Sequence, residues 1–308
     1  MFLGFGFNEA MTSSLIGEPL LNQFGLSYNK EQAVFVQNPQ SEDHTMLRQT
    51  TIANMLSTLK MNFDNGQKNV WLYELGKTYF IKKPAEKIDS GVEENLMISG
   101  IMTGETNNNL WKKLPSTDFY TLKGYLESLF ALLNISGRVK LNPSNECSYL
   151  HPGRCAKVVL LGKTPETVGY FGEIYPIIKD KMKINQNIYL FEINLSKLLK
   201  ASAVHTAKYK PLPLYPDVQR DISFAIEKNI SNDEIVLAIR KSADSKLFKG
   251  ANLFDIYEGE HIQEGYKSLA YRITLQDEES TLTDERINAE MTTIRNGLMK
   301  KFPAINFR

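Results

Sequence analysis

The sequence predicts an α+β protein, with an antiparallel sheet and helices in its first part and a βαββαβ domain in its second. Strand-like stretches in the first part follow one another closely, without a helix after each, which argues against a doubly wound parallel sheet. Three prolines within six residues, at 211–216, disfavour a helix and force an extended connector. The border therefore falls near Tyr209, and the two domains are expected at 1–208 and 209–308.

The first domain is expected to hold six strands and two amphipathic helices. The strands are predicted at 33–37, 70–80, 95–104, 156–162, 167–175 and 188–194. The helices are predicted at 50–63 and at 118–135, where Asp118 is the expected cap. Apolar residues cover more than half of the circumference of the second helix. It is therefore either a core helix or one that packs partly on a partner subunit.

The second domain begins with a strand at 217–227. The sequence SNDE at 231–234 is a capping box, and it predicts a helix at 232–243. Two strands and a helix are then expected, followed by the short strand AINFR; the three are predicted at 251–258, 267–276 and 284–301. Thr283 is the expected cap of the last helix, with acidic residues in its first turn. This order is the ferredoxin-like split βαβ arrangement.

In that arrangement both helices cover one face of a four-stranded sheet, and the other face is free. Strand alternation sorts the side chains between the two faces. The residues expected in the core are Val218, Ile222, Phe224, Ile226, Phe254, Ile256, Leu269, Ile273 and Leu275. Leu253 is expected to point outward. The polar side chains expected on the free face are Asp221, Ser223, Asp255, Tyr257, Ser268 and Arg272.

These polar residues suit a reader of splayed RNA bases. A tyrosine ring stacks on any base, with a contribution of roughly 1–3 kcal/mol. A carboxylate such as Asp255 accepts hydrogen bonds from base amino or imino groups, and a serine hydroxyl donates or accepts. The competing interpretation is a solvated sheet face with one exposed tyrosine, and alternation alone favours it.

The charge distribution opposes generic nucleic-acid binding by the second domain. Residues 211–308 hold 13 Lys and Arg against 16 Asp and Glu, a net of −3, which leaves +4 for the rest of a chain whose net charge is +1. Binding that depends on phosphate neutralisation needs a basic stripe. Any RNA contact should therefore be local and weak, made through stacking and base edges.

Composition excludes several other classes. Apolar content of 42% and charged content of 23% are typical of a soluble globular protein. No window approaches 18 uncharged apolar residues, and the first residues lack the basic region of a signal peptide. Cys147 and Cys155 form no CxxC pair, so a reducing compartment is expected, and with it a cytoplasmic location.

The second domain resembles a known family at several segments. The segments LYPDVQRDISF, FDIYEG, GYKSLAYRITLQ, TLTDE and the terminal Arg308 are similar to the ferredoxin-fold anticodon-binding domain that closes the β subunit of bacterial phenylalanyl-tRNA synthetase. Segments of the first domain resemble that subunit's catalytic-like domain, a degenerate class II synthetase fold. They are NPQSEDHTMLRQTTIANML, LYELGKTYF, YTLKGYLESLF, HPGRCA and VGYFGEIYP. The resemblance covers essentially the whole chain, in order.

The resemblance implies a ligase of protein biosynthesis with α₂β₂ composition. Its α subunit would carry catalysis with ATP and Mg, the first domain here would pack against α, and the second would contact the anticodon of tRNA-Phe. The family's anticodon-reading residues fall on Asp255, Tyr257 and Ser268, with Arg272 beside them. Asp221, Ser223 and Arg308 are weaker candidates. Because the family's N-terminal and editing domains have no counterpart, the chain is expected to be a C-terminal portion of such a subunit.

No catalytic residue is expected in this chain. The late Gly-x-Gly-x-x-Arg of class II synthetases is absent, and Arg48 is followed by Gln49 and Thr50, so the ATP-binding Arg-x-Glu is not met there either. Without cationic clamps on the triphosphate, adenylate formation has no electrostatic support. GFGFNE at 4–9 lacks the third glycine of a dinucleotide motif and is interpreted as an approach to a strand.

A metal site and a nucleophilic cysteine are also poorly supported. His151 and Cys155 lie four residues apart in HPGRC, but the proline and glycine between them favour a turn, and no second pair of ligands follows. Nothing marks Cys155 as activated. Two rival functions stay open: a structural assembly module with no RNA contact, and an active class II synthetase-like enzyme.

Overall fold

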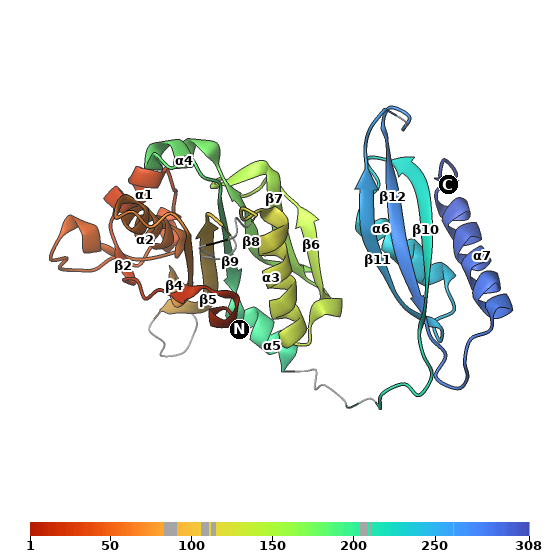
Figure 1. Ribbon diagram of the computed structural model, residues 1–308. Coiled ribbons are helices and arrows are strands. Elements are labelled where there is room, and N and C mark those ends of the chain that lie inside the picture. The colour runs from red at the N-terminus through yellow and green to blue at the C-terminus, as the bar shows by residue number, and fades with distance from the viewer. Residues whose placement is uncertain are drawn as a thin grey trace. The chain divides into compact units, whose positions relative to one another are not determined.

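The computed structural model in Figure 1 describes residues 1–82, 91–105, 111, 115–203, 209, 211–260 and 262–307. The chain divides into two compact units, Met1–Lys208 (unit 1) and Tyr209–Arg308 (unit 2).

Unit 1 is built on a seven-stranded sheet. Its strands lie in the order β1-β4-β5-β9-β8-β7-β6, and all neighbours are antiparallel except β1 and β4. Their bounds are Asn8–Glu9 (β1), Val70–Ile81 (β4), Val92–Thr103 (β5), Val139–Pro143 (β6), Leu150–Leu160 (β7), Glu166–Ile174 (β8) and Ile188–Asn194 (β9). The antiparallel sheet backed by helices is thus confirmed.

Helices cover both faces of this sheet (Figure 1). Their bounds are Glu18–Phe24 (α1), Ile52–Asp64 (α2), Phe119–Leu132 (α3), Pro176–Met182 (α4) and Leu195–Ser202 (α5). Leu72 and Leu190 join one core with α1, α2 and α4, whereas Trp71 and Phe191 join another with α3 and α5. Successive strand residues point to opposite faces, so one sheet supports both cores.

Short elements complete unit 1. They are the strand pair Leu15–Ile16 (β2) and Met46–Leu47 (β3), and the 3-10 turns Leu3–Phe5 (η1), Lys30–Gln32 (η2), Glu42–His44 (η3) and Ser136–Arg138 (η4). Helix α3 begins as expected, because the Asp118 carboxylate accepts a hydrogen bond of 2.6 Å from the Thr121 amide. It ends three residues before the expected position, and Asn134 then takes the left-handed conformation with φ 56°.

The strand expected at 33–37 is wrong. Only Phe35 forms a bridge there, to Met46, and Phe35 is 57% exposed. The Val36 amide donates to Thr45 and the Leu47 amide to Val34, so the ladder is one step long. Its partner β3 has only two residues and offers no further step. The turn expected at HPGR is also wrong, because 151–154 belong to β7, which begins at Leu150.

Unit 2 holds a four-stranded antiparallel sheet in the order β11-β12-β10-β13. Its elements are Val218–Glu227 (β10), Asn232–Ser242 (α6), Phe248–Tyr257 (β11), Tyr266–Leu275 (β12), Asp284–Lys301 (α7) and Asn306–Phe307 (β13). The two central strands are the first and third of the unit, as a split βαβ fold requires. Buried residues of α6 and α7 share one core with β10 and β12. The ferredoxin-like fold is confirmed.

The two helices of unit 2 begin at the expected caps. The Ser231 hydroxyl accepts from the Glu234 amide, and the Glu234 carboxylate accepts from the Ser231 amide, which is the complete capping box. The Thr283 hydroxyl accepts from the Arg286 amide. Each cap satisfies backbone donors that the first helical turn leaves free.

Candidate nucleic-acid interface

The pairing register of β10, β11 and β12 places the predicted polar residues on one face. Directly paired residues of antiparallel strands share a face. Ser268 is paired with Tyr257 on one side and with Ala225 on the other. In the next row, Ala270 is paired with Asp255 and with Ser223. The face of unit 2 that carries these two rows and the Arg272–Asp221 pair beyond them is called the open face below.

Within these two rows, the side chains are small at the centre of the sheet and larger at the β11 edge. The central positions carry only small side chains, those of Ser223, Ala225, Ser268 and Ala270. Tyr257, which is 43% exposed, and the exposed Asp255 stand at the β11 edge. The result is a shallow floor with an aromatic ring and a carboxylate along one side, a shape that admits a flat base.

Asp255 and Tyr257 are free to take a ligand. Neither side chain forms a hydrogen bond or an ion pair within the described part of the chain. Gly259 is close to the Tyr257 ring, since a Cβ at that position would lie 2.4 Å from the Tyr257 hydroxyl oxygen. A larger residue at 259 would therefore move the ring.

Arg272 and Asp221 form the next row of the open face, beyond Ala270 and Ser223. They are directly paired between β12 and β10, and the guanidinium donates twice to the carboxylate, at 2.9 Å from Nε and from Nη2. These bonds lower the pKa of Asp221 and raise that of Arg272. Arg272 is therefore held in place by its partner and presents a fixed planar group at the surface.

A β-bulge changes the expected faces of β11. Leu253 is paired with Tyr271 but Asp255 with Ala270, so Phe254 is the extra residue between them. Leu253 packs against the core, where it was expected to point outward. Phe254 is 52% exposed, and its ring centroid is 5.0 Å from Arg272 Cζ on the open face. The core assignment of Phe254 is wrong, because the bulge reverses the alternation.

Ile256 also departs from the expected core position. It is paired with Leu269, whose side chain is buried on the helix side, yet Ile256 is 57% exposed. Ile256 lies one residue before the end of edge strand β11. Asp255 and Tyr257 keep their expected face because they follow the bulge.

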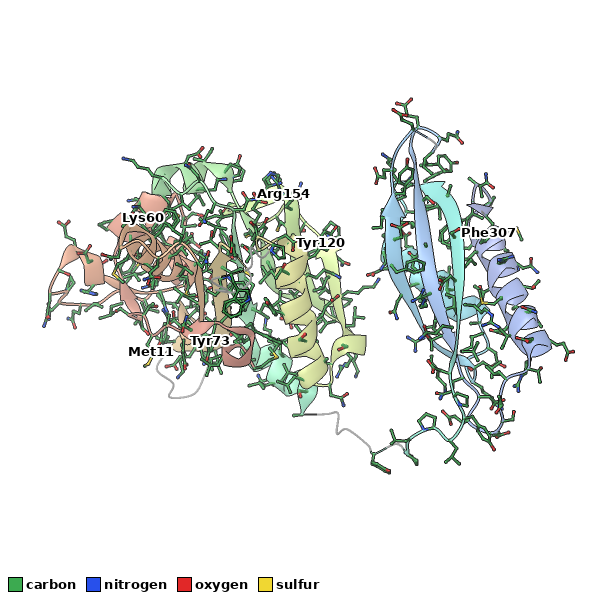
Figure 2. All side chains as sticks on the ribbon, viewed as in Figure 1. Met11, Lys60, Tyr73, Tyr120, Arg154 and Phe307 are labelled. Carbon is green, nitrogen blue, oxygen red and sulfur yellow. The ribbon has the colours of Figure 1, made fainter. Side chains whose placement is uncertain are left out.

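The open face has members that sequence reasoning missed. Phe254 is one, Asn252 is paired with Arg272, and Asn306 of β13 is paired with Ala225. Phe307 (Figure 2) is paired with Phe224 on the helix side, and their ring centroids are 5.7 Å apart. Period-two alternation could have found Asn306, but no residue type marks the bulge at Phe254. Arg308 lies outside the described residues.

Unit 1 contains a polar cleft of about 340 Å³ on the face of its sheet. Glu192 lies in it and accepts hydrogen bonds from the Thr50 hydroxyl and from the amide and hydroxyl of Thr51. Burial raises the pKa of the Glu192 carboxyl despite these donors. The cleft is large enough for a small molecule. Among the described residues, the cation that lines it is Lys197, which forms an ion pair with Glu166, and Arg48 is not part of the lining.

Arg48 is not free to bind phosphate. It is 1% exposed, and its Nη2 forms an ion pair of 2.8 Å with the buried Glu74. The other guanidinium nitrogens donate to the Thr12 hydroxyl and to the Lys77 carbonyl. Gly76 makes room for this arrangement, because a Cβ there would lie 2.2 Å from Arg48 Nη2. The guanidinium is a structural group here.

The cysteines and His151 are likewise occupied or inert. Burial raises the pKa of the Cys147 thiol to about 11 and that of the Cys155 thiol to about 12. His151 Nδ1 accepts from the Gly153 amide, and Nε2 lies 3.1 Å from the Arg154 guanidinium. Among the residues that the structure describes, no three His, Cys, Asp or Glu side chains gather as metal ligands.

None of the helices in the described segments is both long enough and apolar enough to cross a bilayer.

Comparison with known proteins assigns both units. The ferredoxin-like fold of unit 2 agrees with the family comparison: the sequence model described as "Ferredoxin-fold anticodon binding domain" matches residues 213–306. The model described as "Phenylalanyl tRNA synthetase beta chain CLM domain" matches residues 1–195. The chain belongs to the phenylalanyl-tRNA synthetase beta chain family. This confirms the resemblance.

Curated relatives support the same family assignment. The chain is 32% identical over 303 residues to the phenylalanine–tRNA ligase beta subunit of Geobacillus kaustophilus, which covers 98% of this chain and 36% of that one. It is 33% identical over 298 residues to that of Staphylococcus epidermidis, with 96% and 35% covered. The chain thus spans about a third of the length of these relatives.

Among solved structures, pyrrolysyl-tRNA synthetase from Desulfitobacterium hafniense matches with a TM-score of 0.47 and 15% identity, over 65% of this chain and 64% of that one. This likeness is too remote to carry an argument.

Proposed function

We propose that this chain serves a phenylalanine–tRNA ligase as a non-catalytic platform joined to an anticodon-contacting domain. Unit 1 would pack against the ligase α subunit in an α₂β₂ assembly in the cytoplasm. Unit 2 would contact the anticodon of tRNA-Phe. The names of the relatives support the ligase and the tRNA, and the family match of unit 2 supports the anticodon contact.

One observation carries the RNA contact. Asp255, Tyr257 and Ser268, on which the family resemblance places anticodon reading, lie in adjacent rows of one open face. Tyr257 offers a ring for stacking, and Asp255 offers an acceptor that no group uses within the described part of the chain. Because residues 211–308 have a net charge of −3, this contact should depend on bases more than on phosphates.

The proposal of a silent unit 1 is supported by the environment of Arg48. ATP and Mg would be handled by the α subunit, since the candidate cation of unit 1 is committed to Glu74. The platform role is supported by α3, where Tyr120 is 74% exposed and Leu132 68% exposed. Single exposed apolar side chains are common on helices, so the contact with the α subunit rests mainly on the family match of unit 1.

The RNA contact is tested by an NMR titration of the full chain with a tRNA-Phe anticodon hairpin. Shifts of the Asp255, Tyr257 and Ser268 amides that diminish when the anticodon bases are changed would support it. No shift at millimolar hairpin would favour the rival structural module, which the acidic balance of unit 2 also favours.

The second rival, an active synthetase-like enzyme, has a separate test. ATP–pyrophosphate exchange by the isolated chain should be absent if unit 1 is catalytically silent. Phenylalanine-dependent exchange that persists after removal of contaminating α subunit would overturn that part of the proposal.

A further inference from the structure

We infer that Phe254 and Arg272 form a second base-binding subsite on the open face, so that this face holds two consecutive unpaired bases. The inference rests on the proposed function, because it extends the RNA contact of Asp255 and Tyr257. Tyr257 would stack on one base and Phe254 on its neighbour, with the Asp255 carboxylate between them.

The bulge creates this subsite. Phe254 and Asp255 are neighbours in sequence and would face opposite sides in a regular strand that has Leu253 on the helix side. The bulge puts both on the open face, so the half-exposed Phe254 ring shares the face of Asp255. A half-exposed phenylalanine has no role in the core of unit 2. Bulges commonly redirect a side chain beside a binding site, and this one aims an aromatic ring at the row that carries Asp255.

Arg272 keeps the ring in a defined position. Its Cζ is 5.0 Å from the Phe254 ring centroid, within the range of a cation–π contact. The two bonds to Asp221 hold the guanidinium in turn. One side of the ring is thus occupied by a fixed cation, and a base that stacks on the exposed side meets a ring that is already ordered.

The spacing of the two rings selects the ligand. Phe254 and Tyr257 are three residues apart on β11, but the bulge takes up one of these steps, so the two positions are roughly 7 Å apart along the strand at about 3.3 Å per residue. Bases stacked on one another along a strand are only about 3.4 Å apart. Two rings at the larger spacing fit neighbouring bases that have been splayed, the form in which single-stranded loops are recognised.

The acceptor between the rings adds direct readout. Asp255 directly follows the bulge and is paired with Ala270, whose methyl group leaves space beside the carboxylate. A carboxylate accepts from exocyclic amino groups of bases. Stacking on either ring tolerates every base, so discrimination would come from Asp255.

The test is a set of double-mutant cycles between protein side chains and RNA bases. The full chain is titrated with the tRNA-Phe anticodon hairpin and with three hairpins that each lack one anticodon base. The variants are Phe254→Leu and Tyr257→Leu, with Ile256→Leu as the matched control on the same strand. Amide spectra of the free variants confirm that unit 2 is folded.

We expect each aromatic variant to weaken the intact hairpin by roughly 5- to 150-fold, the loss of one stacked base. Phe254→Leu should cause no additional loss of affinity for one of the abasic hairpins. Tyr257→Leu should cause no additional loss for a different hairpin, which lacks the adjacent base. Arg272→Met should weaken binding through the same base as Phe254→Leu. Ile256→Leu should change nothing.

Two results would overturn the inference. If Tyr257→Leu is coupled to a base but Phe254→Leu binds within about twofold of the unchanged chain, the second subsite is absent and the proposed function stands. If neither variant weakens binding, the RNA contact of the open face fails, and the subsite with it.

Discussion

The buried ion pair of unit 1 gives a prediction that separates a structural Arg48 from a phosphate-binding one. Glu74→Gln removes the negative charge and keeps the shape of the side chain. The Arg48 guanidinium then stays charged at a site where both side chains are only 2–3% exposed. Water cannot reach it to replace the lost carboxylate.

The expected cost is large. Breaking a buried ion pair by removing one partner destabilises a protein by about 3–5 kcal/mol, because the remaining charge is left uncompensated. The Thr12 hydroxyl, which donates to Glu74 at 2.7 Å, also loses a charged acceptor. Glu127→Gln is the matched control, since Glu127 pairs with Lys123 on the exposed side of α3. Such helical surface pairs contribute about 0.3–0.5 kcal/mol.

Urea unfolding followed by tryptophan fluorescence measures both variants. The two tryptophans of the chain, Trp71 and Trp111, belong to unit 1, so unit 2 contributes no signal. Trp71 is 6% exposed and reports the loss of the core between the sheet and α3. If Glu74→Gln costs no more than Glu127→Gln, Arg48 is not committed to the fold, and phosphate binding by unit 1 becomes tenable again.

Further predictions concern packing, thiols, a cap and the open face. Gly76→Ala should lower the urea midpoint of unit 1, because its Cβ would meet the Arg48 guanidinium; an unchanged midpoint would show that this group can move. Cys147 and Cys155 stay protonated in the folded chain up to pKa values of about 11 and 12 but ionise near 9 when unfolded, so stability should fall as pH rises above about 9. Equal stability at pH 8.5 and 10 in urea titrations would contradict this. Thr283→Ala should cost about 1 kcal/mol in calorimetric unfolding, and a change below about 0.3 would refute a capping role. Gly259→Ala should weaken hairpin binding without altering the melting temperature; unchanged affinity would show that the Tyr257 ring adapts.

Long, strongly patterned elements were predictable from the sequence. The strand at 188–194 and the helix at 284–301 are found with those bounds, since one is a continuous buried run and the other has a cap and an apolar stripe. Short elements such as β6, α4 and α5 were not predicted. They have five to eight residues, and tertiary contacts decide their structure more than their own patterns do.

The open face was predicted only in part, for a physical reason. Alternation assumes a regular ladder, and it held for β10 and β12, where Ile222 and Ile273 are buried and Asp221 and Arg272 exposed. On β11 the bulge inserts a residue without a glycine to announce it, so Phe254 was assigned to the wrong face. The role of the face in RNA contact came from resemblance, because exposed polar residues alone do not specify a ligand.

The affinity of the full chain for the tRNA-Phe anticodon hairpin, before and after Tyr257→Leu, tests the central claim most directly. Tyr120→Leu is the control, as Tyr120 is an exposed tyrosine of unit 1. Base reading by the open face predicts that fluorescence anisotropy shows a loss of roughly 5- to 150-fold for Tyr257→Leu alone. Equal affinities for both variants and the unchanged chain would contradict it and leave unit 2 as a structural module.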